Sequence, residues 1–376
     1  PVDVDRFRGA GTLPVPDGLA SRGYDLVLSA LVPYKRVDLA VFRNIAAAID
    51  GSFAGGIYAL TAANDGITYA PFHDAMIPAE AAATVEMVRA GLADGSIDTG
   101  VCGIDGLFLG EGSACDGGAA PEPEGPSGLL TLEEECATWG GLQAPDGFRV
   151  NLVTDIGKID DGTFNQFAYE GMVGALDCFG IEDSDVIETA SEADYEGNIA
   201  TSLSQEPDVI VTVGFLITTD TETAALENPD TNFIGIDQFL LEYPANMIGV
   251  LFNEHEGGFI AGALAASLTE SGVVGVVGGR EDVPPVVKFV NGYTAGAMYI
   301  NEDVRVLSIY NESFTDPAKG ASDANQFIGE GADVIFGAGG PTGSGGVKAA
   351  AEQGVWAIGV DQDEYFTTFA GGTAPG

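Results

Sequence analysis

Residues 154–171 of the chain read TDIGKIDDGTFNQFAYEG. An apolar run, 148–153, precedes this stretch, and a segment with helical spacing, 164–179, follows it. A strand that ends at an acidic residue, then a polar loop, then a helix is typical of an α/β fold, in which ligands bind beyond the carboxyl ends of the strands. The residues expected to face a ligand are Asp155, Asp160, Asp161, Thr163, Phe164 and Asn165. The structural alternative is a capped loop, with Asp161 or Thr163 as the helix cap and Phe164 in the core.

The composition excludes several classes of protein. A chain of 376 residues with 45% hydrophobic residues is long enough for two domains and can bury a full core. Its 57 acidic and 14 basic residues give a net charge of −43, which opposes binding to nucleic acids and anionic membranes, since both require Lys and Arg. No apolar run reaches the ~20 residues of a membrane helix. The chain opens on PVDVD, without a signal peptide, so we expect a processed product.

Four cysteines point to disulfide bonds rather than to a metal site. They are Cys102, Cys115, Cys136 and Cys178, and the first three bracket a low-complexity stretch. Disulfides there indicate an oxidising, extracytoplasmic compartment, although the sequence does not choose among the three possible pairings. The chain has two His and no C-x2-C spacing, which disfavours zinc, and we expect no metal or cofactor.

From residue 148 onward, apolar runs alternate with segments of helical spacing. The predicted strands are 149–154, 208–213, 232–236, 247–251, 273–277, 304–309, 333–337 and 355–360. The predicted helices are 163–179, 192–205, 218–227, 255–270, 286–300, 316–330 and 343–353. This alternation predicts parallel sheets with right-handed crossovers, in two lobes that enclose a cleft. The strand ends that would line the cleft are Asp155, Gly214, Asp237, Gly337 to Gly340, and Asp361.

The first hundred residues predict a mixture of elements, and a linker follows them. We expect a strand at 24–31, helices at 35–50 and 78–93, and a hairpin of strands 56–60 and 67–70 around the turn Asn64-Asp65-Gly66. Residues 103–147 include the stretch GEGSACDGGAAPEPEGPSG, whose Gly, Pro and acidic residues predict a linker.

Three motifs at strand ends carry the chemistry of binding. The Gly-rich run GAGGPTGSGG, 337–346, lacks the spacing of a phosphate loop, so close backbone approach to an uncharged ligand is the favoured interpretation. Asp361 can accept hydrogen bonds from sugar hydroxyls, with a helix cap as the alternative. Phe164 and Phe314 can sandwich a flat ring, although Phe is more often a core residue.

No enzymatic constellation is visible in the sequence. His73 and His255 lie far apart in sequence, and there is no G-x-S-x-G elbow. Paired carboxylates carry little information in so acidic a chain. We therefore expect a binding protein rather than an enzyme.

Six stretches together resemble one known family. They are VTDIGKIDDGTFNQFAYEG (153–171), EGGFIAGALAA (256–266), KFVNGYTAGA (288–297), SFTDPAKG (313–320), GADVIFGAGGPTGSGG (331–346) and WAIGVDQDEYF (356–366). The resemblance is to the basic membrane protein family, the nucleoside-binding receptors of certain ABC transporters. It implies an α/β, two-lobed periplasmic-binding-protein-like fold, each lobe a mostly parallel sheet flanked by helices. It also implies a purine nucleoside or similar ligand and an ABC permease as partner.

The resemblance assigns roles residue by residue. Phe164 and Phe314 would stack on the base, and Asp155 and Asn165 would bond its edge. Gly339 would approach the ligand by its backbone, and Asp361 would take the ribose hydroxyls. Asp237 is a further candidate. Lys35 corresponds to the family's ribose-binding Lys, although Pro33 and Tyr34 depart from the family's plainer run.

The order of the segments departs from the family. KRVDLAVF (35–42) and APFHDAMIPAE (70–80) stand near the N-terminus here, whereas in the family they follow the GVD strand near the end, so the chain resembles a circular permutation. The predicted organisation is 1–102, a permuted part of lobe I; 103–147, the linker; 148–253, the core of lobe I; 254–361, lobe II; and 362–376, a tail returning to lobe I or to a neighbouring subunit.

The ends of the chain raise the possibility of assembly. Residues 2–5, VDVD, echo residues 360–363, VDQD, as in a unit of a tandem or head-to-tail array. The alternative to a nucleoside receptor is therefore a structural subunit of an extracellular filament or sheath with a vestigial cleft.

Overall fold

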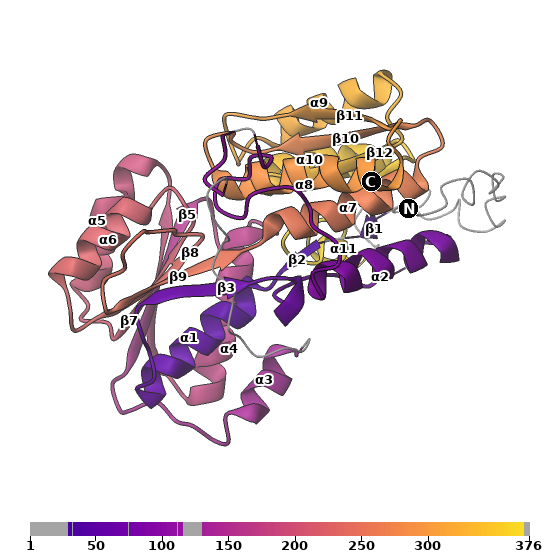
Figure 1. The fold of residues 1–376 in the computed structure, drawn as a ribbon. Helices are drawn as coiled ribbons and strands as arrows, with labels where there is room; N and C mark the ends of the chain where they lie inside the picture. The colour runs from indigo at the N-terminus through magenta and orange to yellow at the C-terminus, as the bar shows by residue number, and fades with distance from the viewer. Residues whose placement is uncertain (1–28, 32, 74, 111, 116–129, 372–376) are drawn as a thin grey trace.

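The computed structural model describes residues 29–371, apart from 32, 74, 111 and 116–129, and it consists of two lobes (Figure 1). We call the six-stranded sheet and its helices lobe I, and the five-stranded sheet and its helices lobe II. Every strand pair within these two sheets is parallel. The expected two-lobed α/β fold is therefore confirmed.

Lobe I carries its helices on both faces of the sheet. Its strands are β3 (Gly56–Leu60), β5 (Arg149–Ile156), β6 (Asp183–Thr189), β7 (Val209–Val213), β8 (Asn232–Ile236) and β9 (Met247–Phe252), in the order β3-β9-β8-β7-β5-β6. Its helices are α1 (Val37–Asp50), α3 (Leu132–Thr138), α4 (Phe164–Phe179), α5 (Tyr195–Leu203) and α6 (Thr218–Glu227), with the short helix η3 (Glu192–Asp194) before α5. Helix α1 packs closely on α4 because Gly171 has no side chain; a Cβ there would lie 2.3 Å from the Asp38 carbonyl oxygen.

Lobe II is organised around the pair α7 and α8. Its strands are β1 (Ser29–Leu31), β10 (Val273–Gly278), β11 (Arg305–Ile309), β12 (Val334–Ala338) and β13 (Trp356–Ile358), in the order β1-β13-β12-β10-β11. The helices that pack with it are α2 (Ala79–Ala93), α7 (Glu254–Leu268), α8 (Pro284–Ile300), α9 (Pro317–Gly329), α10 (Gly340–Glu352) and α11 (Glu364–Thr367). A Cβ at Gly262 would lie 2.0 Å from the Tyr293 carbonyl oxygen, so glycine sets the spacing of α7 and α8.

The hairpin predicted around Asn64 is wrong. Strand β3 pairs in parallel with β9 of lobe I, whereas β4 (Ile67–Tyr69) pairs antiparallel with β2 (Pro33–Lys35) in a separate two-stranded sheet. The short helix η2 (Ala62–Asn64) separates the two strands, and the Asn64 side chain accepts the Thr61 N–H at 2.8 Å. The local turn signal is real, but it redirects the chain between two sheets.

The N-terminal segment contributes to both lobes, although we expected it in lobe I. Strand β3 and helix α1 belong to lobe I. Strand β1 adds to the sheet of lobe II, and α2 places Val85 and Val88 in the same core as Phe259 and Leu264 of α7. Residues 29–102 therefore complete both sheets.

The stretch expected as a linker contains ordered structure at both ends. Cys102 pairs with Cys115, and Cys136 pairs with Cys178, which ties α3 to the end of α4. The unpredicted helix α3 begins with a capping box, in which the Thr131 hydroxyl accepts the Glu134 N–H. That T-x-x-E signal was present in the sequence. Most of the Gly/Pro-rich run, 116–129, lies outside the described residues.

The described part of the tail packs on its own chain. The Thr367 hydroxyl donates to the Gly162 carbonyl oxygen at 2.8 Å, and Glu364 is fully buried. His73 lies 2.5 Å from Asp363 and stacks on Tyr365. A place for this tail in a neighbouring subunit stays a prediction.

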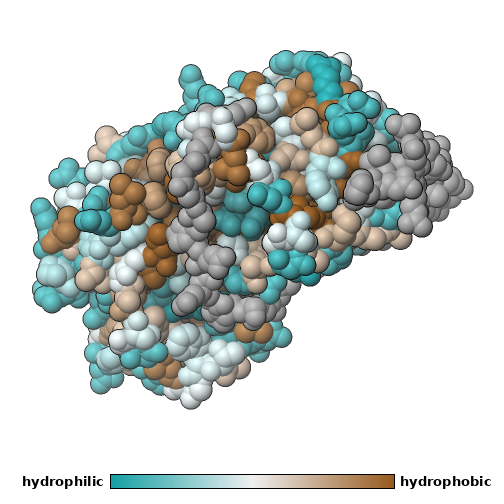
Figure 2. All heavy atoms as spheres, in the orientation of Figure 1, coloured by the Kyte–Doolittle hydropathy of each residue, from teal (hydrophilic) through white to brown (hydrophobic). Residues whose placement is uncertain are grey.

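The surface fits the strong negative charge of the chain. On the face shown in Figure 2, hydrophilic residues and smaller apolar groups are interspersed over both lobes. Among the described residues, no helix is both long enough and apolar enough to cross a bilayer.

Candidate functional site

A cavity lies between the two lobes. The residues that line it include Lys35, Asp155, Phe164, Asn165, Asp237, Phe314, Gly339 and Asp361, all of them predicted site residues. Asp161 lines it as well, whereas Asp160 lines a separate surface pocket and Thr163 is fully buried outside the cavity lining. The lining residues come from both lobes and from the N-terminal segment, and the carboxyl ends of the parallel strands converge there, as the fold requires. Their individual roles in binding stay predictions.

Asn165 joins the end of β5 to the start of α4. Its side-chain oxygen accepts the Asp155 N–H at 3.0 Å, and its amide nitrogen donates to Asp161 at 3.0 Å. Asp161 also accepts the Thr163 N–H at 2.9 Å, so Asp161 rather than Thr163 caps this helix. The Asn165 amide has one further N–H that can donate to a ligand. The main role of this side chain is to position Asp155.

Asp155 is a buried acceptor at the end of β5. Its carboxylate accepts the Ile156 N–H at 2.7 Å and the Tyr195 hydroxyl of α5. Burial raises the pKa of Asp155, while the Tyr195 hydrogen bond opposes that rise. A Cβ at Gly214 would lie 2.3 Å from this carboxylate, so glycine makes room for it. Sequence reasoning missed Tyr195, and no sequence signal marks it.

The two aromatic rings come from opposite lobes. Phe164 opens α4 of lobe I, and Phe314 lies in the loop between β11 and α9 of lobe II. The Lys35 ammonium group lies 4.7 Å from the centroid of the Phe164 ring. The Phe314 carbonyl oxygen accepts the Thr342 N–H at 2.9 Å, which fixes its loop on α10. A flat ligand in this cavity would meet one ring from each lobe.

Backbone packing alone requires glycine at position 339, whether or not a ligand is bound. A Cβ at Gly339 would lie 2.4 Å from the Gly279 backbone nitrogen, and a Cβ at Gly279 would lie 2.3 Å from the Phe314 ring. These glycines let Phe314 reach the cavity. Helix α10 begins at Gly340, so the Gly-rich run is a strand end and a helix start rather than a loop.

A buried network of four charges stands beside the cavity. The Lys35 ammonium group lies 2.5 Å from Asp237 and 2.8 Å from Glu254, and the second oxygen of Glu254 pairs with Lys288. Burial alone would lower the pKa of Lys35, but Asp237 and Glu254 raise it above its usual range. Two cations and two anions thus neutralise each other. Among the described residues lining the cavity, Lys35 is the one cation.

Sequence reasoning missed Glu254 and Lys288. Lys288 opens KFVNGYTAGA, one of the stretches that carry the resemblance, so a signal existed for it. Glu254 is one of 57 acidic residues, and nothing in the sequence distinguishes it.

Asp361 presents an unsatisfied acceptor to the cavity. It follows β13 in the left-handed region, with φ of 69°, and it is 7% exposed. Its carbonyl oxygen accepts the Lys35 N–H at 3.0 Å, but no described residue donates a hydrogen bond to its carboxylate. Burial raises its pKa to about 7, although Lys35 opposes the rise. A buried carboxylate without donors favours a ligand that brings hydroxyl groups.

Comparisons with known proteins identify the family to which the chain is similar. A family model described as "ABC transporter substrate-binding protein PnrA-like" matches residues 148–370. Basic membrane protein A of Borreliella burgdorferi is 34% identical over 222 residues, covering 58% of this chain and 64% of that protein. The ABC transporter nucleoside-binding protein BmpA of Lactococcus lactis is 32% identical over 232 residues, covering 57% of this chain and 64% of that protein.

A solved structure shares the fold. It is an ABC transporter system solute-binding protein from Aeropyrum pernix, 32% identical, with a TM-score of 0.52 over 56% of this chain and 61% of that one. The chain spans just under two thirds of the length of the curated relatives it matches.

Proposed function

This chain belongs to the Bmp family of PnrA-like ABC transporter substrate-binding proteins, and from that premise we propose that it binds a purine nucleoside or a similar small molecule in the interlobe cavity. One observation carries the proposal. Phe164 and Phe314 reach the same cavity from opposite lobes, beside the buried carboxylate of Asp361 that no described residue bonds. Flat rings and hydroxyl groups are the two ligand features that this arrangement would recognise.

Each side chain would have a distinct task. The Phe164 and Phe314 rings would stack on the two faces of the base when the lobes close on it. Asp155, held by Tyr195 and Asn165, would accept hydrogen bonds from N–H groups at the base edge. Asp361 would accept hydrogen bonds from the sugar hydroxyls.

The electrostatics would select against phosphates. The positive charge of Lys35 is already neutralised by Asp237 and Glu254, and Asp155 and Asp361 add carboxylates to the cavity wall. Since phosphate recognition needs unpaired cationic donors, a nucleoside fits the cavity and a nucleotide does not.

The physiological role would be delivery of this ligand to an ABC permease, without chemistry on the ligand. The name of the Lactococcus relative links this family to nucleosides and to ABC transport. The disulfides Cys102–Cys115 and Cys136–Cys178 favour an extracytoplasmic location, because disulfides persist in oxidising compartments.

The N-terminal segment would be a circularly permuted part of the family's domain. The family model matches 148–370 and leaves residues 29–102 outside, yet β1 and β3 complete the two sheets. The Lys35 N–H also donates to the Asp361 carbonyl oxygen. The permuted segment therefore begins beside the strand end after which the family's chain would continue into it. Moving residues 29–102 behind residue 371 by a short linker should give a folded protein with unchanged ligand affinity, whereas failure to fold would argue against permutation.

Isothermal titration calorimetry with adenosine, guanosine and inosine tests the proposal. At least one should bind in the micromolar range or tighter, and adenosine 5′-monophosphate should bind at least about a hundredfold more weakly than adenosine because of the like charges at the cavity wall. Folded protein that binds no nucleoside at millimolar concentration would refute the proposed function.

A further inference from the structure

A second cavity adjoins the first. The two share Phe215, Asp237 and Pro285 as a common wall. None of the roles proposed above uses this second space.

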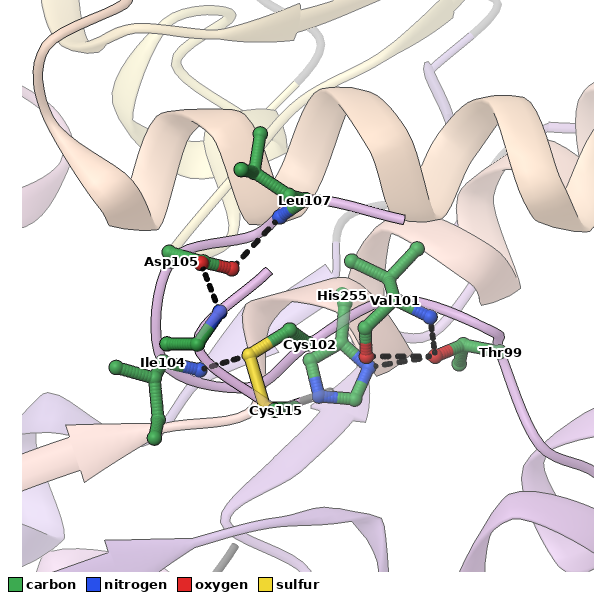
Figure 3. The surroundings of a disulfide bond; sticks show 9 residues. Thr99, Val101, Cys102, Ile104, Asp105, Leu107, Cys115 and His255 are labelled. Atoms are coloured by element: carbon green, nitrogen blue, oxygen red, sulfur yellow. Dashed lines mark hydrogen bonds between the residues drawn. A yellow bond between two sulfur atoms is a disulfide. The ribbon is translucent and has the colours of Figure 1, made fainter. Parts of the chain in front are cut away.

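Gly103, Ile104 and Asp105, from the loop closed by the Cys102–Cys115 disulfide, line the second cavity. Figure 3 shows this loop beside His255 of α7. Asn291 of α8 donates its amide to the Gly106 carbonyl oxygen at 2.7 Å, and Thr99 bonds His255 of α7 at 2.9 Å. The loop is thereby fixed to lobe II. It lies outside the matched region 148–370, so this wall comes from a part of the chain that the family model does not cover.

The Asp105 carboxylate of the loop is turned to the loop itself. The Asp105 carboxylate accepts the Leu107 N–H at 3.0 Å and the Ala114 N–H at 2.5 Å, and Figure 3 shows it folded back on its own backbone. Ile104 is the residue of this loop that adds an apolar surface to the cavity wall. Ile57, Ala59, Phe239 and Leu251 of lobe I line the cavity with it, so the space is largely apolar.

One unsatisfied polar atom belongs to the shared wall. Oδ1 of Asp237 is buried and has no hydrogen-bond partner among the described residues, while Oδ2 is held by Lys35. Asp237 is 7% exposed, so this acceptor is nearly removed from water. Of the other charged residues that line this cavity, Asp105 is bonded within its own loop, and Lys288 is bonded to Glu254 and to the Phe252 carbonyl oxygen. A ligand group that donates to Asp237 would therefore satisfy the site.

Lys35 contacts both Asp237 and Asp361. Its ammonium group bonds the Asp237 carboxylate, and its backbone N–H donates to the Asp361 carbonyl oxygen. With the base between Phe164 and Phe314 and the ring hydroxyls of the sugar at Asp361, the 5′ group is the part of the nucleoside left to face Asp237. Resting on the proposed function, we propose that the second cavity binds an apolar substituent at the 5′ position of the nucleoside, joined through an N–H group that donates to Asp237.

Calorimetry with three synthetic probes, each compared with adenosine, tests this assignment. We expect 5′-butylamino-5′-deoxyadenosine to bind at least tenfold more tightly than adenosine, since each buried methylene contributes about a fourfold gain in affinity. The 5′-butylthio analogue, which lacks the donor, should gain less. N6-butyladenosine, with the same chain on the base, should gain nothing.

A variant that fills the second cavity tests whether the affinity gain of the butylamino probe arises there. Ala59→Phe should reduce the affinity gain of the butylamino probe over adenosine at least fivefold and leave the affinity for adenosine within twofold. The control Ala83→Phe, at an exposed position of α2, should change neither affinity. Thermal melting confirms that both variants are folded. If adenosine binds but the butylamino probe binds no better, or if Ala59→Phe leaves its gain intact, the inference is overturned and the proposed function stands. If no nucleoside binds, both fall.

Discussion

The Lys35 ammonium group lies 2.5 Å from the Asp237 carboxylate, and both side chains are almost completely buried. This pair connects the N-terminal segment to the end of β8 in lobe I, and Glu254 and Lys288 extend it to lobe II. The network therefore ties together three parts of the chain beside the proposed ligand cavity. Its integrity should matter for stability as well as for binding.

Lys35→Met should lower the free energy of unfolding by about 3–5 kcal/mol, because removing one partner of a buried ion pair leaves a charge unpaired. Urea denaturation followed by circular dichroism measures the change. The matched control is Arg305→Met, which breaks a pair with Glu330 whose side chains are 56% and 38% exposed, and it should cost less than about 1 kcal/mol. Equal losses in the two variants would contradict a buried network.

Nucleoside affinity should rise with pH. Burial raises the pKa of Asp361 to about 7 in the free protein, and a carboxylate that accepts hydroxyl hydrogen bonds must be ionised. Binding then releases a proton, so affinity should fall about thirtyfold between pH 8 and pH 5.5. Calorimetry across this range measures it. Asp361→Asn should bind more weakly at pH 8 and lose most of the dependence, while an unchanged slope in that variant would assign the effect elsewhere.

Glu256 should make the ligand-free protein less stable as pH rises. Burial raises its pKa to about 7 from an ordinary 4.5, against the hydrogen bonds from the Ala62 N–H and from Asn253. A carboxyl group whose pKa is higher in the folded state than in the unfolded state stabilises the fold fully at pH values below its unfolded-state pKa. That stabilisation is lost as the pH rises through its folded-state pKa. The unfolding free energy should therefore fall between pH 4.5 and 7. Glu256→Gln should flatten this slope in urea titrations, and a slope equal to the wild type would exclude Glu256 as its source.

The two disulfides should differ in their contribution to stability. Cys136–Cys178 spans 42 positions of sequence and Cys102–Cys115 spans 13. Chain entropy predicts losses of about 4 and about 3 kcal/mol on replacing each pair by Ser. Parallel denaturant titrations of the two double variants measure the order, and a larger loss for the shorter loop would contradict it.

The sequence predicted the strands that are continuous apolar runs and missed β6 and the three-residue strand β2. Residues 232–236 and 218–227 were predicted with the bounds that β8 and α6 have in the structure. Strand β6 was missed because DSDVIET is mostly polar; it lies at the edge of the sheet, where polar residues face solvent. The supposed hairpin failed because pairing partners are chosen by the tertiary fold, beyond the reach of a local turn signal.

The candidate site was largely predictable because the carboxyl ends of parallel strands must converge. That rule and the quoted motifs brought Asp155, Asp237 and Asp361 together before any geometry was known. Tyr195 and Glu254 were not predictable, because a buried partner is defined by contacts between distant elements rather than by spacing.

The proposed function requires a flat base to bind between Phe164 and Phe314. The most direct measurement is the calorimetric affinity for adenosine of the wild type, of Phe314→Ala, and of Phe366→Ala, a control outside the cavity whose side chain is 60% exposed. The account predicts that Phe314→Ala loses about 1–3 kcal/mol of binding free energy, the contribution of stacking on one base, with Phe366→Ala unchanged. A folded Phe314→Ala variant that binds adenosine as tightly as the wild type would contradict it.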